Sequence, residues 1–289
     1  MAWAHQAISR LEFSTMVNMR FSIRWFWAFI TLLVFNQFAL AGTPKTVQLE
    51  ELTWTELREQ IHAGKTTVII PVGGTEQSGP DVALGKHNAR VKILSQRIAE
   101  GLGNALVAPV IAYVPEGSYA PATAHMRFPG TITIPDDVFE KTLESAANSF
   151  KIHGFTHIVF LGDHGGYQDD IKRVVARLNK SWASSSARAF MPTEYYHASS
   201  DGYAQILRQH GYHDNEIGTH AALADTSLQL AIAPQMVRQD QLQSDRRHSA
   251  SDGIYGGDPR RSSPELGQLG IDSIIARTID AIKKAAAGR

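Results

Sequence analysis

Apolar and polar residues follow two different rhythms along this chain, which predict strands and helices in turn. Continuous apolar runs rich in β-branched residues indicate buried strands at 67–72, 105–111, 130–134, 157–161 and 187–191. Apolar residues spaced three or four positions apart predict helices at 53–64, 89–102, 136–153, 168–182, 225–233 and 270–287. Strands that alternate with helices are typical of a parallel sheet covered on both faces. We therefore expect a three-layer α/β/α sandwich with a mostly parallel sheet.

The N-terminal segment has the pattern of a secretory signal peptide. A short basic region at 19–24 precedes the apolar run 25–35, and Ala39-Leu40-Ala41 supplies small residues at a cleavage site. We expect cleavage after Ala41, with residues 1–18 as an extension from an early start codon. The apolar run is shorter than the ~20 residues that a spanning helix needs, which disfavours the alternative of an uncleaved anchor. We therefore expect residues 42–289 to form one domain, periplasmic or secreted, without stable membrane insertion.

Composition narrows the chemistry further. The sequence contains no cysteine, so a metal ion would have to be held by histidine, aspartate or glutamate. Its formal net charge is zero, which gives no basic surface for nucleic acid. We therefore expect no nucleic-acid partner and no thiolate site.

Candidate metal ligands follow the two most apolar strands. Glu76 comes directly after strand 67–72, His87 lies eleven residues later, and His164 follows strand 157–161 in a glycine-rich turn. The carboxyl ends of parallel strands meet at one edge of a sheet, which is where ligands bind in open α/β folds. Two histidines and a carboxylate are also the protein ligands of a catalytic zinc site. The sequence therefore predicts a metal site containing Glu76, His87 and His164.

Four segments, in this order, resemble the creatininase family of metal-dependent amidohydrolases. They are Val72–Gln77 with Gly79-Pro80, His125–Thr131, His153–Phe155 with Gly162–Gly166, and Glu216–Ala221 with Asp225–Ser227. The resemblance implies a creatininase-like hydrolase domain over 42–289 that cleaves a C–N bond of a small amide, cyclic amides included. It also implies a homo-oligomer, commonly a hexamer. Finally, it implies that His220 moves protons and that Asp225 acts as a catalytic carboxylate or a fourth metal ligand.

The sequence departs from the family pattern at the metal ligands. Ser78 stands where the family's usual two-metal site has a histidine, and His87 stands at the position of its bridging aspartate. An imidazole cannot bridge two ions because it offers one nitrogen to a metal, whereas a carboxylate has two oxygens. We therefore expect one divalent ion rather than two, with zinc favoured over manganese. The lost ligands leave open an alternative function, a non-catalytic periplasmic metal- or ligand-binding protein.

Each candidate also has a structural interpretation. His87 could be a surface residue of a helix, Asp225 could cap one, and His220 could stabilise its own loop. The substrate would be recognised by loop residues such as Ser118, Tyr119 and Tyr167, which no motif interprets.

Signal-peptide cleavage can be tested directly. We expect the mature protein to begin at or near Gly42, because the small residues at 39 and 41 complete the cleavage pattern. Intact mass spectrometry of protein recovered from its native envelope measures this. A mass that retains residues 25–35 would show an uncleaved anchor instead.

Overall fold

A four-stranded parallel sheet forms the centre of the computed structural model, which describes residues 45–243 and 249–287. The predicted signal peptide at 1–41 lies outside these residues. The strands are β1 (Thr67–Val72), β2 (Ala105–Val107), β3 (His157–Gly162) and β4 (Arg188–Phe190), in the order β2-β1-β3-β4. In the central pair, Thr67 lies opposite His157 and Val72 opposite Gly162. The loops that leave β1 and β3 therefore start side by side at the same edge of the sheet.

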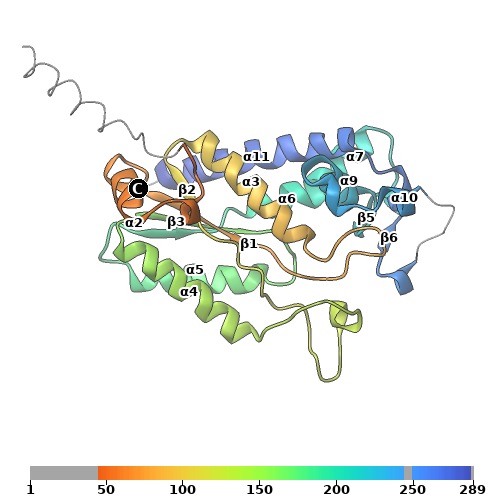
Figure 1. Ribbon diagram of the computed structural model, residues 1–289, viewed down its shortest axis with the longest axis horizontal. Helices are drawn as coiled ribbons and strands as arrows, with labels where there is room; N and C mark the ends of the chain where they lie inside the picture. The colour runs from red at the N-terminus through yellow and green to blue at the C-terminus, as the bar shows by residue number, and fades with distance from the viewer. Residues whose placement is uncertain (1–44, 244–248, 288–289) are drawn as a thin grey trace, which may run out of the picture. The chain divides into compact units, whose positions relative to one another are not determined.

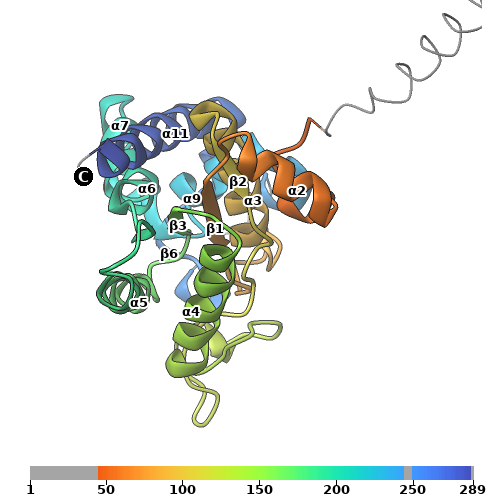
Figure 2. The same cartoon turned by 90° about the vertical axis from the view of Figure 1, so that its left-hand side faces the viewer.

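Helices cover both faces of this sheet (Figures 1 and 2). They are α2 (Trp54–His62), α3 (Lys86–Leu102), α4 (Asp136–Ile152), α5 (Gln168–Ser181), α6 (Thr193–Ser199), α7 (Asp201–Gln209), α8 (Asp214–Ile217), α9 (Leu223–Ile232), α10 (Gln239–Leu242) and α11 (Pro264–Ala287). Helices α3, α6, α9 and α11 lie on one face, and α4 and α5 lie on the other. Within the described residues, no helix is both long and apolar enough to cross a membrane.

The alternation of side chains along the strands creates two hydrophobic cores. Ile158 and Phe160 of β3 belong to the core shared with α4 and α5. Val159 and Leu161, which alternate with them, belong to the core shared with α3, α6, α9 and α11. Each fully buried aliphatic or aromatic side chain stabilises the fold by about 1.5–3 kcal/mol. Burial on both faces explains why β1 and β3 are continuously apolar, and it confirms the expected three-layer α/β/α sandwich.

The structure differs from the sequence prediction at two of the apolar runs. Strand β2 ends at Val107, two residues before Pro109, although we predicted a strand to 111. Proline lacks an N–H for the strand ladder, which accounts for this early end. The strand predicted at 130–134 was wrong, because this segment is a loop in which Thr133 forms a single bridge to Val114. A short antiparallel pair, β5 (Gly218–His220) and β6 (Tyr255–Gly257), was not predicted.

Tyr167 joins the ends of β1 and β3. Its side chain is completely buried, and its hydroxyl lies 2.6 Å from the carbonyl oxygen of Gly73 and 2.8 Å from that of Val72. The same oxygen accepts hydrogen bonds from the backbone N–H groups of Asp163 and His164. The sequence interpretation of Tyr167 as a residue that contacts substrate was wrong, because the ring lies in the core. Tyr167 instead fixes the backbone at the edge where both loops leave the sheet.

Removing this hydroxyl should destabilise the protein. In Tyr167→Phe, buried carbonyl and N–H groups lose their partner, which typically costs about 1–3 kcal/mol. For a chain of this size that corresponds to a melting temperature lower by roughly 2–4 °C per kcal/mol, measurable by calorimetry. Tyr113→Phe, at a side chain that is 60% exposed, is the control and should melt like the parent. Equal melting temperatures for both variants would show that the hydroxyl does not stabilise the fold.

A candidate metal centre at the sheet edge

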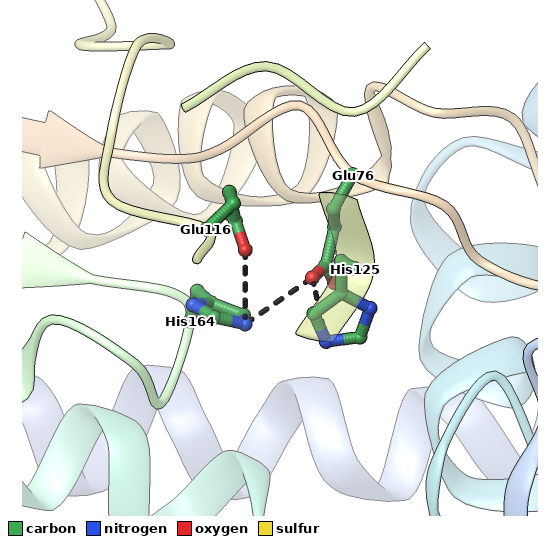
Figure 3. A group of neighbouring side chains, drawn as sticks. All are labelled: Glu76, Glu116, His125 and His164. Carbon is green, nitrogen blue, oxygen red and sulfur yellow. Dashed lines mark ion pairs between the residues drawn. The ribbon is translucent and has the colours of Figure 1, made fainter. Parts of the chain in front are cut away.

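Two carboxylates and two imidazoles converge just beyond β1 and β3 (Figure 3). Glu76 is completely buried, and its Oε2 lies 3.2 Å from Nε2 of His125 and 3.2 Å from Nε2 of His164. Oε2 of Glu116 lies 3.5 Å from the same His164 nitrogen. One ligand atom from each of these four residues lies within 4.8 Å of the others. The four side chains therefore form a group with the spacing of a metal site, which we call the four-ligand cluster.

Three of the four carboxylate oxygens of this cluster lack hydrogen bonds within the described part of the chain. Among the described residues, both carboxyl oxygens of Glu116 and Oε2 of Glu76 are without a hydrogen-bond partner. A buried polar atom without a partner costs free energy, so native structures rarely leave one unless a water or an ion completes it. Two carboxylates and two imidazoles are a donor set that fits a divalent transition-metal ion. The cluster therefore fits the expected metal chemistry, although with a different set of ligands.

Local backbone geometry brings the ligands together. Gly74, in the loop after β1, has φ +149°, and a Cβ at this position would lie 2.7 Å from Oε1 of Glu116. Only glycine leaves room for that carboxylate. His125 follows Ala124, whose φ of 45° is uncommon for a residue with a side chain. The backbone N–H of Gly166 donates to Nδ1 of His164, so that its Nε2 faces the carboxylates.

The charges around the two carboxyl groups give them opposite protonation. Burial, followed by the negative charge of Glu76, raises the pKa of Glu116 to about 9. Burial also acts to raise the pKa of Glu76, but the charge of Lys86 and close contacts with His164 and His87 hold the pKa well below its usual value. Without a metal ion, Glu116 therefore holds a proton at neutral pH while Glu76 is ionised. A divalent ion would displace that proton.

The structure places His87 and Asp225 outside the four-ligand cluster. Nε2 of His87 lies 2.8 Å from Oε1 of Glu76, and its Nδ1 lies 2.6 Å from Oδ2 of Asp163. Asp225 forms ion pairs with Lys86 and Arg90. An imidazole between two carboxylates has no nitrogen left for a metal, and a carboxylate between two cations is already neutralised. Of the four ligands predicted from the sequence, the cluster thus contains Glu76 and His164.

Glu116 and His125 are the residues of the four-ligand cluster that sequence reasoning missed. His125 belongs to one of the segments that resemble the creatininase family, yet the pattern gave it no role. Glu116 lies between Pro115 and Gly117 in a loop with no regular period and no motif. Only their contacts with Glu76 and His164 identify them.

His220 lies beside the cluster on β5. Its Nε2 lies 3.0 Å from the carbonyl oxygen of Gln77, and its Nδ1 lies 3.5 Å from Nζ of Lys86. Burial and then the positive charge of Lys86 lower the pKa of His220 to about 3. The imidazole is therefore neutral at pH 7, and its ring centroid lies 4.5 Å from that of His125.

A cleft of about 550 Å³ opens over this edge of the sheet, a size typical of small-molecule sites. Its lining includes His125, His164 and His220 on the cluster side, and Tyr196 and Arg208 on the side of α6 and α7. The arrangement offers a bound small molecule access to the metal ligands.

Substitutions can separate the four-ligand cluster from the ligands predicted from the sequence. Glu116→Gln keeps the side chain's size but loses its charge, and His125→Ala removes an imidazole. Each should weaken metal binding by at least about 100-fold, since even the partners of metal ligands contribute 10–100-fold. Asp225→Asn is the control and should retain the metal, as measured by inductively coupled plasma mass spectrometry. Loss of metal in Asp225→Asn, with retention in Glu116→Gln, would place the ion at the sequence-predicted ligands instead.

Comparison with known proteins agrees with the fold. The sequence profile of the creatininase family, described as creatinine amidohydrolase, matches residues 50–282. Creatinine amidohydrolase of Pseudomonas putida is 26% identical over 203 residues, covering 68% of this chain and 76% of that protein. The 3-dehydro-scyllo-inosose hydrolase of Thermotoga maritima is 25% identical over 198 residues, covering 68% of this chain and 60% of that protein.

Solved structures show the same fold. A crystal structure of creatininase superimposes with a TM-score of 0.69 at 22% identity, covering 85% of this chain and 100% of the other. Related creatininase structures include a zinc form and a manganese form. The expected fold and the expected class of enzyme, a hydrolase of C–N bonds, are confirmed at the level of the family. The chain belongs to the creatininase family.

Proposed function

We propose that this protein hydrolyses the C–N bond of a small amide, cyclic amides included, with one divalent ion held by the four-ligand cluster. Zinc is favoured and manganese is the alternative. The observation that carries the proposal is the meeting of two buried carboxylates, with oxygens that lack hydrogen bonds, and two imidazoles that line a cleft.

The ion and the protein would divide the chemistry between them. A divalent ion at such a site polarises a carbonyl group and makes water nucleophilic at neutral pH. Glu76 and Glu116 supply the negative charge that holds the ion, and His125 and His164 supply the nitrogens. The cleft then orients the amide against this group.

His220 is the best candidate for moving protons. His220 lines the cleft beside the cluster, and an imidazole is a side chain that can accept a proton and return it to the leaving nitrogen. Asp225 is less suited to this task. Both of its carboxylate oxygens pair with cations, Oδ2 with Lys86 and Oδ1 with Arg90. Although burial acts to raise the pKa of Asp225, these charges hold the pKa well below its usual value. We therefore assign Asp225 to holding these two cations, not to proton transfer.

The relatives suggest which substrates to test. They are named for creatinine, for 3-dehydro-scyllo-inosose and, in Mycolicibacterium smegmatis, for the mycofactocin precursor peptide. A panel of cyclic amides, linear amides and short peptides covers the substrates with a C–N bond among these. Export to the periplasm and assembly into a hexamer remain predictions from the sequence.

Replacing His220 should separate metal binding from turnover. His220→Ala should keep the metal, because His220 is outside the four-ligand cluster, and lose about 10²–10⁴-fold in kcat on the substrate that the panel identifies. His210→Ala, at an exposed histidine at the end of α7, is the matched control and should turn over like the parent.

Two outcomes would contradict this proposal. Parent-like turnover by His220→Ala would make His220 a structural residue. Tightly bound metal without cleavage of any amide in the panel would favour the alternative of a non-catalytic binding protein.

A further inference from the structure

Lys86 places an ammonium group inside the site. The residue lies in the first turn of α3, and only 1% of its surface is exposed. Its Nζ lies 3.4 Å from Oε1 of Glu76 and 3.5 Å from Nδ1 of His220, and it forms an ion pair with Asp225. Lysine is almost never fully buried unless it is paired, so a specific role is expected for this side chain.

The side chains around this ammonium are of the types that bind metal ions. Glu76 and Asp225 offer carboxylate oxygens, and His220 offers an imidazole nitrogen. Glu76 contacts both the four-ligand cluster and this ammonium. Its Oε2 faces His125 and His164, and its Oε1 faces Lys86. A carboxylate with oxygens on two sides is the group that bridges two ions in two-metal sites. Here one of the two positions already contains a cation from the protein itself.

The charges around the site agree with a single ion. Four carboxylates lie at this edge of the sheet and are linked through the side chains that they contact. They belong to Glu76, Glu116, Asp163 and Asp225. Lys86 and Arg90 supply two positive charges, and Arg90 pairs with both Asp163 and Asp225. Two negative charges then remain when all four carboxylates are ionised, which one divalent ion offsets. A second divalent ion would leave the buried site with excess positive charge, and more so whenever His87 is protonated.

We propose that the ammonium of Lys86 takes the place of a second metal ion. It limits the site to one divalent ion and holds Oε1 of Glu76 while Oε2 faces that ion. The inference rests on the proposed four-ligand cluster and assigns Lys86 as a positioning residue. Unlike a metal ion, this cation is covalently part of α3 and cannot be removed by a chelator.

Metal counting tests the proposal. The parent protein, equilibrated with excess zinc and then gel-filtered, should retain about one ion per chain by inductively coupled plasma mass spectrometry. Lys86→Ala opens the space between Glu76, His220 and Asp225 and should retain about two. Lys86→Gln, which keeps a hydrogen-bonding group but no charge, should also retain more than one. Lys92→Ala is the matched control, because this lysine is on the same helix with a half-exposed side chain, and it should retain one.

Paramagnetic resonance measures whether an added ion lies next to the first one. With manganese in place of zinc, the parent should give the paramagnetic resonance signal of isolated ions, and Lys86→Ala should give that of a coupled pair about 3.5–4 Å apart. Circular dichroism shows which variants are folded.

Three results would overturn the inference. They are two ions in the parent, one ion in both folded Lys86 variants, or two uncoupled manganese ions in Lys86→Ala. These differ from a failure of the proposed function, which would appear as metal retained in Glu116→Gln or as no amide cleaved.

Discussion

The buried carboxylate of Glu76 is the group on which the rest of the site depends. An ionised carboxylate removed from water is costly unless charges and hydrogen bonds compensate it. Its partners come from separate parts of the chain: the first turn of α3, the turn after β3, the loop that contains His125, and β5. One buried negative charge therefore determines how these segments meet at the sheet edge.

Helix α3 supplies most of the compensating charge. Lys86 and Arg90, four residues apart, lie on the same side of the helix, and His87 is between them in sequence. All three contact carboxylates of the site, on Glu76, Asp163 or Asp225. A single helical turn thus sets the electrostatic potential on one side of the cluster. The opposite side, formed by Glu116, His125 and His164, is the side with oxygens that lack hydrogen bonds.

The sequence predicted the elements and residues that depend on a local pattern. It failed to predict those that depend on contacts between residues far apart in the chain. The runs 67–72 and 157–161 are long and apolar, so β1 and β3 and the ligands directly after them, Glu76 and His164, could be located. The short elements α6 to α8, β5 and β6 have no sustained period. His87 was correctly placed near Glu76, but its partner Asp163 and the pairing of Asp225 with two cations arise only in the folded chain. Glu116 had no local signal, because its neighbours are loop residues.

The protonation of Glu116 also affects the protein before an ion binds. With a pKa of about 9, this carboxyl group is neutral in the metal-free protein at physiological pH. Glu76 is then not faced by a second buried negative charge, so the sheet edge can close without waiting for an ion. Charge repulsion at this edge is accordingly low in the protein without an ion, and a divalent ion that bound there would release the proton of Glu116.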